Sequence, residues 1–273
     1  MLNDIYQMID PVAFSIGSYE VRWYGLAYIA GFIVAALVLY RTAKRWKMPL
    51  SVDEVLLVIV SIALGVIVGA RLFYVLFYNL DYYLSNPLHV FMFTEGGMSF
   101  HGGLVGALAG GYVACRYLRL SFVTLCDMAV IGAPWGLFFG RCANFVNGEL
   151  WGKPTDLPWG VVFESGGDVA RHPSQLYEAL LEGIVLFVIL YALSRRMPPR
   201  PRGTFIGVFL VGYGVARFAI EFVRVPDAQL GYLFGPITMG QLLSIPLLIA
   251  GAAVLIVSHR LKSPQHLRVG DRR

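Results

Sequence analysis

Long apolar stretches alternate with short polar segments along almost the whole chain. We place about seven such stretches, at 24–40, 55–77, 98–115, 122–140, 176–194, 203–222 and 236–257. Each is close to the roughly 20 residues that an α-helix needs to cross the hydrocarbon core of a bilayer. An open sheet cannot satisfy its backbone hydrogen bonds in lipid. The pattern therefore predicts an all-α, polytopic membrane bundle with about seven transmembrane helices.

The composition argues against a water-soluble protein. Of the 273 residues, 57% are hydrophobic and only 14% are charged, whereas a soluble domain carries about 25% charged residues. The length suits one compact membrane-embedded domain over 1–273 rather than several domains. Within it, 141–175 is the longest extramembrane segment, and we expect it to form a small outward, periplasmic head or lid.

Lysine and arginine gather in alternate loops. The basic segments are 41–47, 116–119, 195–202 and the tail from residue 260, while the intervening loops hold few positive charges. Because basic loops stay in the cytoplasm, we expect the N-terminus outside and the C-terminus in the cytoplasm. Topology thus accounts for the net charge of +5, and we expect no nucleic-acid binding.

Cysteine chemistry is not expected in this chain. Cys115, Cys126 and Cys142 are odd in number, lack metal-ligand spacing and form no disulfide framework. We expect Cys115 and Cys126 to be buried thiols, and we expect no metal site.

Ionisable groups at membrane depth are costly, so each is a functional candidate. In the sixth stretch, Tyr213, Arg217, Glu221 and Arg224 follow helical spacing and share one face. Arg217 and Glu221 are placed to form an ion pair one turn apart. The alternative is an ion pair that only holds the bundle together.

A second candidate set ends the fourth stretch. Arg141, Asn144 and Asn147 share a face if the helix continues that far. A guanidinium followed by two carboxamides offers several donors to a phosphate or glycerol headgroup. Alternatively, these side chains cap the helix and extend to the interface.

The third and fifth stretches add titratable groups. His101 lies between glycine pairs, where the backbone can approach a ligand closely, and histidine suits proton transfer near neutral pH. The alternative is a structural histidine, and no second metal ligand lies at the required spacing on that helix. Glu178 and Glu182 lie one turn apart and could pair with arginines of neighbouring helices. Tyr24, which starts the first stretch, could equally belong to the aromatic belt.

These side chains gather at the outer half of the bilayer, and inward-facing arginines suit an anionic headgroup. The residues alone predict a membrane protein that handles an anionic lipid or solute from the outer side. A transporter or flippase, a seven-span receptor and another lipid-headgroup transferase remain alternatives.

Four motifs bear a resemblance to one family. The runs Gly96–Gly103, Gly140–Gly152 and Arg171–Glu178 resemble signatures of the phosphatidylglycerol–prolipoprotein diacylglyceryl transferases. So does the series Tyr213, Arg217, Glu221, Arg224, Pro226 and Asp227. The motifs keep their order over nearly the whole chain, and Ala143 stands where many members have glycine.

The resemblance implies a multi-pass enzyme of the bacterial inner membrane that uses no cofactor. It would transfer the diacylglyceryl group of phosphatidylglycerol to the lipobox cysteine of a preprolipoprotein and release glycerol 1-phosphate. This is the first step of lipoprotein maturation.

The resemblance also suggests roles for the candidate residues. Arg141 and Arg217 would stabilise charge on the departing phosphate, and His101 would take the thiol proton or orient the group that does. The expected headgroup ligands are Asn144, Asn147, Glu149 and Arg224. Glu221 would hold Arg217, while Tyr24 and Tyr213 would orient the phosphate.

Overall fold

The computed structural model describes residues 2–17, 19–48, 50–92, 96–226, 231–233 and 235–268. The chain divides into two compact units. Unit 1 comprises Met1–Trp46 and Cys126–Gln265, and unit 2 comprises Lys47–Leu125 and His266–Arg273. Asp227, the last member of the fourth motif, lies outside the described residues.

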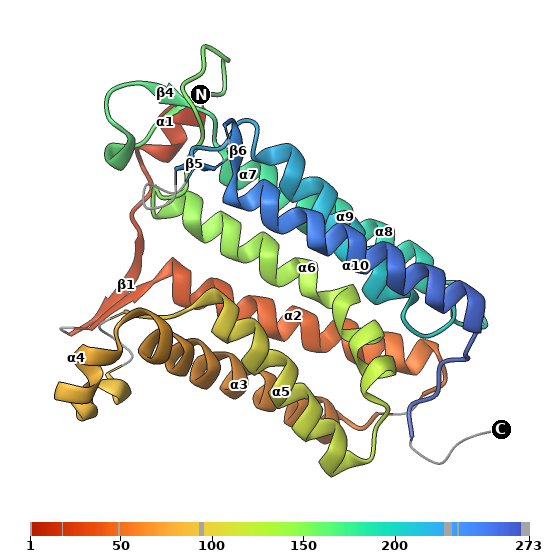
Figure 1. Cartoon of the computed structure of the whole chain (residues 1–273). Coiled ribbons are helices and arrows are strands. Elements are labelled where there is room, and N and C mark those ends of the chain that lie inside the picture. The colour runs from red at the N-terminus through yellow and green to blue at the C-terminus, as the bar shows by residue number, and fades with distance from the viewer. Residues whose placement is uncertain are drawn as a thin grey trace. The chain divides into compact units, whose positions relative to one another are not determined.

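Helices overlap all seven predicted apolar stretches (Figure 1). Those centred in unit 1 are α2 (Trp23–Arg45), α6 (Phe122–Val146), α7 (Ser174–Glu178) with η4 (Ala179–Val185) and α8 (Leu186–Ser194), α9 (Thr204–Ile220) and α10 (Met239–Leu261). Those of unit 2 are α3 (Val52–Tyr78) and α5 (Phe100–Leu118). The prediction of a mostly helical membrane protein is confirmed.

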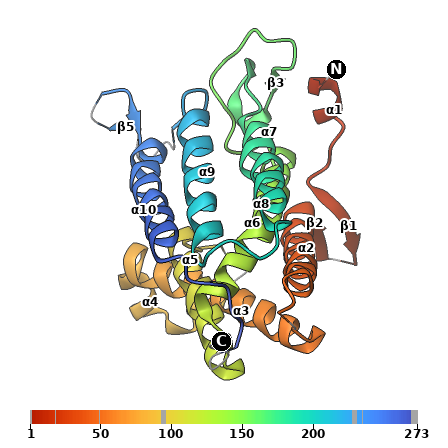
Figure 2. The same ribbon diagram turned by 90° about the vertical axis from the view of Figure 1, so that its right-hand side faces the viewer.

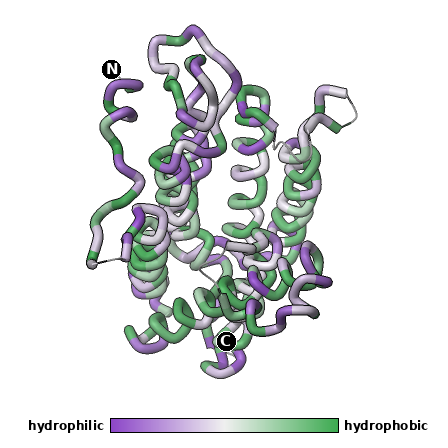
Figure 3. Tube along the Cα trace, turned by 90° about the vertical axis from the view of Figure 1, so that its left-hand side faces the viewer, coloured by the Kyte–Doolittle hydropathy of each residue, from purple (hydrophilic) through white to green (hydrophobic). Residues whose placement is uncertain are grey.

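Within the described part of the chain, five helices are long and apolar enough to cross a membrane. They are α2, α3, α6, the continuous helix Ser174–Ser194 and α10. Helix α9 is apolar but has only 17 residues, and the glycine-rich α5, with 19 residues, is not among the five. The multi-pass character follows from these helices, and the number of seven crossings stays a prediction. Figure 3 shows hydrophobic residues along the helices and hydrophilic residues in connections such as that between α6 and α7.

Capping boxes define where two of the long helices begin. The Ser51 hydroxyl accepts the Glu54 amide at 3.1 Å, and the Glu54 carboxylate accepts the Ser51 amide at 2.8 Å. Thr238 and Gln241 repeat this arrangement at the start of α10, with distances of 3.2 and 3.1 Å. Each box satisfies two amides that a helix start otherwise leaves without partners.

The helix Ser174–Ser194 contains a wide π-helical turn, Ala179–Val185. Pro173 immediately precedes this helix as its N-cap residue. At Gly183 a Cβ would lie 2.7 Å from the Cβ of Phe138, so glycine permits close contact between this turn and α6. Turns of this kind are uncommon and occur frequently at functional sites.

In unit 1, α6, α8, α9 and α10 lie side by side (Figures 1 and 2). The fully buried Asp127 of α6 fixes the start of α9. Its carboxylate accepts the amides of Gly203 and Ile206 at 2.6 and 2.9 Å, and the Gln265 amide at 2.6 Å. A carboxylate at a helix start satisfies free amides and interacts well with the helix dipole.

Three short antiparallel hairpins complete unit 1, and the apolar pattern did not predict them. They pair β1 (Val12–Ile16) with β2 (Tyr19–Arg22), β3 (Val161–Val162) with β4 (Ala170–Arg171), and β5 (Tyr232–Leu233) with β6 (Ile237–Thr238).

The β3–β4 hairpin packs against the N-terminal helix α1 (Leu2–Tyr6). Tyr6 lies edge-on against Phe145 and Phe163, with ring centroids 5.2 and 4.9 Å away. The Asn3 side chain accepts the Val162 amide at 2.9 Å. The segment 141–175 therefore begins within α6, ends within α7 and packs against the N-terminal helix α1. Its role as an outward head stays a prediction.

In unit 2, α3 and α5 meet backbone to backbone. A Cβ at Gly106 would overlap the carbonyl oxygen of Gly65, and a Cβ at Gly69 would overlap that of Gly102. The shorter elements of this unit are α4 (Leu80–Ser85) and η1 (Pro87–Phe91).

Candidate active site

Two arginines from different helices share one buried carboxylate. Arg141 of α6 places its Nε 3.3 Å from Glu178 Oε2, and Arg217 of α9 forms an ion pair with Glu178 Oε1. The Glu178 side chain is fully buried, whereas those of Arg141 and Arg217 are 17% and 14% exposed. The structure thus brings the two candidate arginines together on one carboxylate of α7.

Glu182 adds a second carboxylate one turn further along the same helix. Its Oε2 lies 3.4 Å from Arg141 Nη2, and its side chain is also fully buried. The phenol of Tyr213 lies within electrostatic range of Glu182, Arg141 and Arg217. Helices α6, α7–η4 and α9 therefore all contribute to one polar centre.

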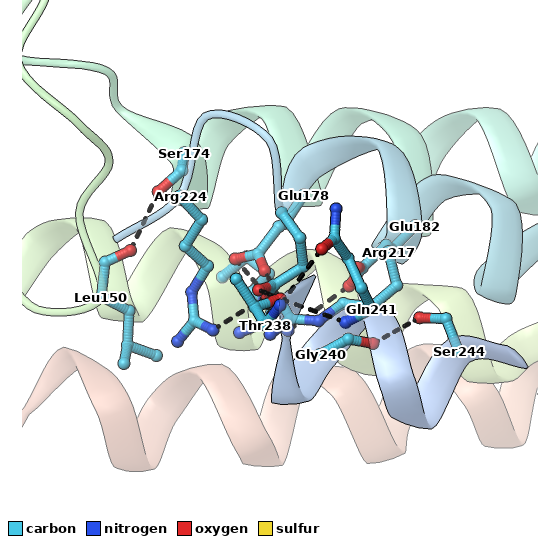
Figure 4. Close-up of polar contacts among 12 residues, drawn as sticks. Leu150, Ser174, Glu178, Glu182, Arg217, Arg224, Thr238, Gly240, Gln241 and Ser244 are labelled. Atoms are coloured by element: carbon cyan, nitrogen blue, oxygen red, sulfur yellow. Dashed lines mark hydrogen bonds and ion pairs between the residues drawn. The ribbon is translucent and has the colours of Figure 1, made fainter. Parts of the chain in front are cut away.

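Glu221 connects this centre to α10. Its partners Arg217, Arg224 and Thr238 are labelled in Figure 4. Its Oε1 lies 2.6 Å from Arg217 Nη2 and 3.2 Å from Arg224 Nη1. Its Oε2 accepts a hydrogen bond from the Thr238 hydroxyl at 2.5 Å. The expected pairing of Arg217 with Glu221 is present in the structure, and Arg224 shares the same carboxylate.

We call these six residues the charge cluster. Its members are Arg141, Glu178, Glu182, Arg217, Glu221 and Arg224. Ion pairs buried in this way cost desolvation energy that their mutual attraction only partly offsets. Hydrophobic contacts could join the same helices without that cost. A buried network of this size therefore points to binding or catalysis rather than to packing alone.

A second polar group lies at the end of α6. Asn144 and Asn147 direct their amide nitrogens to Glu149 Oε1, at 2.7 and 3.4 Å. The Tyr24 hydroxyl interacts with Asn144 and Glu149, and lies 3.3 Å from the hydroxyl of Tyr28. Three residues that the sequence singled out, Tyr24, Asn144 and Asn147, thus meet around the carboxylate of a fourth, Glu149.

The segment that follows α6 is tied to the end of α9. The Lys153 amide donates to the Val223 carbonyl at 2.8 Å, and the Gly152 amide donates to the His172 carbonyl at 2.8 Å. A Cβ at Gly152 would lie 2.7 Å from both the Val223 oxygen and the His172 Cβ, which explains the glycine. Burial lowers the pKa of His172, so its imidazole is neutral at physiological pH.

A cavity of about 580 Å³ borders the charge cluster. Glu221 and Gln241 form part of its wall, and Lys153 lies beside Tyr232 on another part. Its remaining lining is mostly apolar: Phe218, Phe222, Gly235, Pro236 and Ile237. An amphiphilic molecule fits this combination better than a fully polar one.

His101 belongs to unit 2. It is the second residue of α5, which Ser99 caps by accepting the Gly102 amide at 3.4 Å, and its exposed ring packs edge-on against Phe100. The arginines of the charge cluster belong to unit 1. The expected participation of His101 in the same reaction stays a prediction.

Arg71 in α3 is a buried arginine that the sequence analysis did not identify. It is 2% exposed and donates to the carbonyls of Val90, Gly97 and Met92 at 2.9, 3.2 and 3.0 Å. Its place inside an apolar stretch was a detectable signal. Through these hydrogen bonds, Arg71 holds the chain that precedes α5.

Thr238 and Gln241 also escaped the sequence analysis, because nothing marks a helix cap as a neighbour of Glu221. Among the described residues, no group of three or more His, Cys, Asp or Glu side chains could hold a metal ion.

Comparison with known proteins identifies close relatives. A family model described as prolipoprotein diacylglyceryl transferase matches residues 11–257. A phosphatidylglycerol–prolipoprotein diacylglyceryl transferase of Geobacter sulfurreducens is 53% identical over 254 residues, which cover 93% of this chain and 97% of the relative. An enzyme of the same name from Methylococcus capsulatus is 49% identical over 260 residues, covering 94% and 98%. One from Pseudomonas aeruginosa is 47% identical over 261 residues, covering 95% and 97%.

Proposed function

Because the chain belongs to the prolipoprotein diacylglyceryl transferase family, we propose that it transfers the diacylglyceryl group of phosphatidylglycerol to a preprolipoprotein. The acceptor is the thiol of the lipobox cysteine, and the reaction is the first step of lipoprotein maturation. The observation that carries this proposal is the pair of arginines, Arg141 and Arg217, that share the buried carboxylate of Glu178. Guanidinium groups are well suited to bind a phosphodiester by paired hydrogen bonds.

The reaction exchanges one bond for another. A sulfur–carbon bond forms at the glyceryl carbon while the bond from that carbon to the phosphate oxygen breaks. The products are a thioether and glycerol 1-phosphate, so negative charge grows on the departing phosphate. Donors already in place at a buried site stabilise such charge more than water does. Arg141 and Arg217 have this role in our proposal.

The acceptor thiol must lose its proton before it attacks, because the thiolate is the nucleophile. We assign His101 to accept this proton or to orient the group that accepts it. The exposed position of His101 at the start of α5 leaves its imidazole accessible to a substrate. The protein's own cysteines have no part, since the nucleophile belongs to the acceptor.

The second polar group suits the glycerol headgroup. Asn144 and Asn147 already bind Glu149, and its carboxylate would accept hydrogen bonds from the free glycerol hydroxyls. Tyr24, next to this group, and Tyr213, next to the charge cluster, would orient the phosphate between them. Glu221 would hold both Arg217 and Arg224 in place.

The membrane arrangement forms part of the proposal. Phosphatidylglycerol reaches such a site from within the bilayer, and we place the protein in the bacterial inner membrane with its N-terminus outside. The alternation of basic loops supports this orientation.

The test uses purified protein, phosphatidylglycerol and a synthetic lipobox peptide. We expect the peptide to gain the mass of one diacylglyceryl group, with one glycerol 1-phosphate released for each peptide modified. A peptide with serine in place of the cysteine is the matched control and should stay unmodified. Movement of lipid between leaflets without a covalent product would contradict the proposal and favour a flippase.

A further inference from the structure

The start of α7 holds the backbone of the segment that follows α6. The Gln175 side-chain amide donates a hydrogen bond to the Glu149 carbonyl at 2.6 Å. The Ser174 hydroxyl donates one to the Leu150 carbonyl at 2.9 Å (Figure 4). Both donor residues are fully buried. Two neighbouring side chains of one helix therefore fix two successive peptide groups.

These two hydrogen bonds support an unfavourable backbone conformation. Leu150 has a φ of 60°, which lies in the left-handed region that a residue with a Cβ rarely adopts. Such a conformation persists only where the surrounding structure fixes it. The two bonded carbonyls belong to the peptide groups on either side of the Leu150 Cα. Gln175 and Ser174 therefore hold this residue in its conformation.

The turn held in this way carries the carboxylate of the second polar group. Glu149 is the residue that, in the proposed function, accepts hydrogen bonds from the free glycerol hydroxyls. Further along α7, Glu178 contacts Arg141 and Arg217, the proposed phosphate ligands. The same short helix thus contacts both ends of the proposed headgroup site, through the backbone of the turn at one end and through a carboxylate at the other.

We propose that Ser174 and Gln175 are positioning residues that fix the Glu149 carboxylate and thereby set the selectivity for a headgroup with free hydroxyls. They act through the backbone of the turn and do not touch the reacting atoms. A binding group distinguishes ligands only when the residues around it hold it in place. The choice of ligand rests on the proposed function, whereas the support of the turn can be tested without any substrate.

Hydrogen exchange of the purified protein in detergent tests this support directly. Gln175→Met removes the amide donor with little change in size, and Ser174→Ala removes the hydroxyl. In both variants we expect the backbone amides of 148–153 to exchange at least about tenfold faster, because the turn opens more readily. The Gly152 amide, which donates to the His172 carbonyl at 2.8 Å, reports on this opening.

Ser194→Ala is the matched control. Ser194 is the last residue of the helix that Ser174 begins, is also fully buried, and donates to the Tyr191 carbonyl at 2.7 Å. Its loss should leave the exchange of 148–153 at the wild-type rate. The control therefore separates support of this turn from a general loosening of the helix.

Transfer kinetics with two lipids test the consequence. Phosphatidylpropanol has the same phosphodiester as phosphatidylglycerol but lacks both free hydroxyls. The wild type should prefer phosphatidylglycerol by at least about tenfold in kcat/KM, because hydrogen bonds to a charged group are lost with the other lipid. Gln175→Met and Ser174→Ala should lose most of this preference and keep kcat/KM for phosphatidylpropanol within about threefold of the wild-type value. Ser194→Ala should keep the preference, which does not depend on the amount of folded enzyme.

The proposal is overturned if 148–153 exchanges at the wild-type rate in Gln175→Met and Ser174→Ala, or if these variants lower kcat/KM for both lipids by the same factor. A wild type without preference between the lipids also overturns it, because Glu149 would then not bind the hydroxyls. A wild type that forms no thioether with either lipid would contradict the proposed function, while faster exchange in the two variants would still show that Ser174 and Gln175 hold the turn.

Discussion

Two helix contacts in this molecule use opposite kinds of residue. In unit 2, α3 and α5 meet through glycines, whereas in unit 1, α6, α7–η4 and α9 meet through arginines and glutamates. Lipid chains are as apolar as leucine, so helices in a membrane associate by close packing and by polar contacts rather than by the hydrophobic effect. Glycines provide close packing at little energetic cost. The buried charges are expensive and indicate a chemical task.

The two helix contacts should respond differently to substitution. A side chain added to the glycine contact should change stability and leave the chemistry of the phosphate site intact. A charge removed from the charge cluster should change the chemistry first.

Arg217→Ala should lower kcat/KM for transfer by about a hundredfold to a thousandfold, because it removes a donor aimed at the developing phosphate charge. Thioether formation with the purified variant measures this effect. Arg45→Ala is a matched control, since Arg45 also joins two helices but binds Ser194 and Tyr191 at the far end of α8. Equal losses in the two variants would mean that Arg217 serves only to hold helices together.

His101→Asn should lower the rate by about a hundredfold if the imidazole accepts the thiol proton. The pH–rate profiles of thioether formation by the wild type and by the variant measure this role, because loss of a general base changes the shape of the profile. A variant profile of unchanged shape would assign His101 to positioning. The result shows whether unit 2 contributes to the chemistry or only to the structure.

Gly106→Ala should destabilise the protein by about 1–3 kcal/mol, because its Cβ would overlap the Gly65 carbonyl in the α3–α5 contact. Thermal unfolding in detergent measures the change. The control is Gly136→Ala on α6, whose Cβ would find no described atom within 4 Å. A larger loss of stability for Gly136→Ala than for Gly106→Ala would contradict this account of the glycine contact.

Thr238→Val should lower stability by about 0.5–2 kcal/mol, because it removes the N-cap of α10. It also removes the hydrogen bond to Glu221, so transfer should fall modestly as Arg217 becomes less well held. Thr238→Ser keeps the hydroxyl and should restore both properties. If Thr238→Ser behaves like Thr238→Val, the hydroxyl is not responsible.

The sequence predicted the long helices well, because twenty-residue apolar stretches have few alternatives. The stretch placed at 24–40 is the helix Trp23–Arg45, and that placed at 236–257 is Met239–Leu261. Two of the three hairpins were missed because β3, β4, β5 and β6 have two residues each, which is too few for an alternating pattern to be recognised. Their pairing depends on contacts between distant parts of the chain.

The sequence predicted which residues belong to the candidate site better than it predicted which of them contact one another. Helical spacing placed Arg217 and Glu221 on one face, and the structure shows them 2.6 Å apart. Spacing within a helix cannot show which side chains of other helices meet it. The sequence therefore left open which arginines Glu178 and Glu182 contact, and it gave no sign of Thr238. Arg71 was detectable as an arginine inside an apolar stretch but was overlooked.

A double-mutant cycle on Arg141 and Arg217 shows whether the two guanidiniums bind the same phosphate. Arg141→Lys, Arg217→Lys and the double variant retain the charge but lose the forked geometry, so their rates should remain measurable. If both arginines bind one phosphate, kcat/KM of the double variant should be only slightly lower than that of the less active single variant. If the two losses multiply, Arg141 and Arg217 act independently, and the account of a shared phosphate site is wrong.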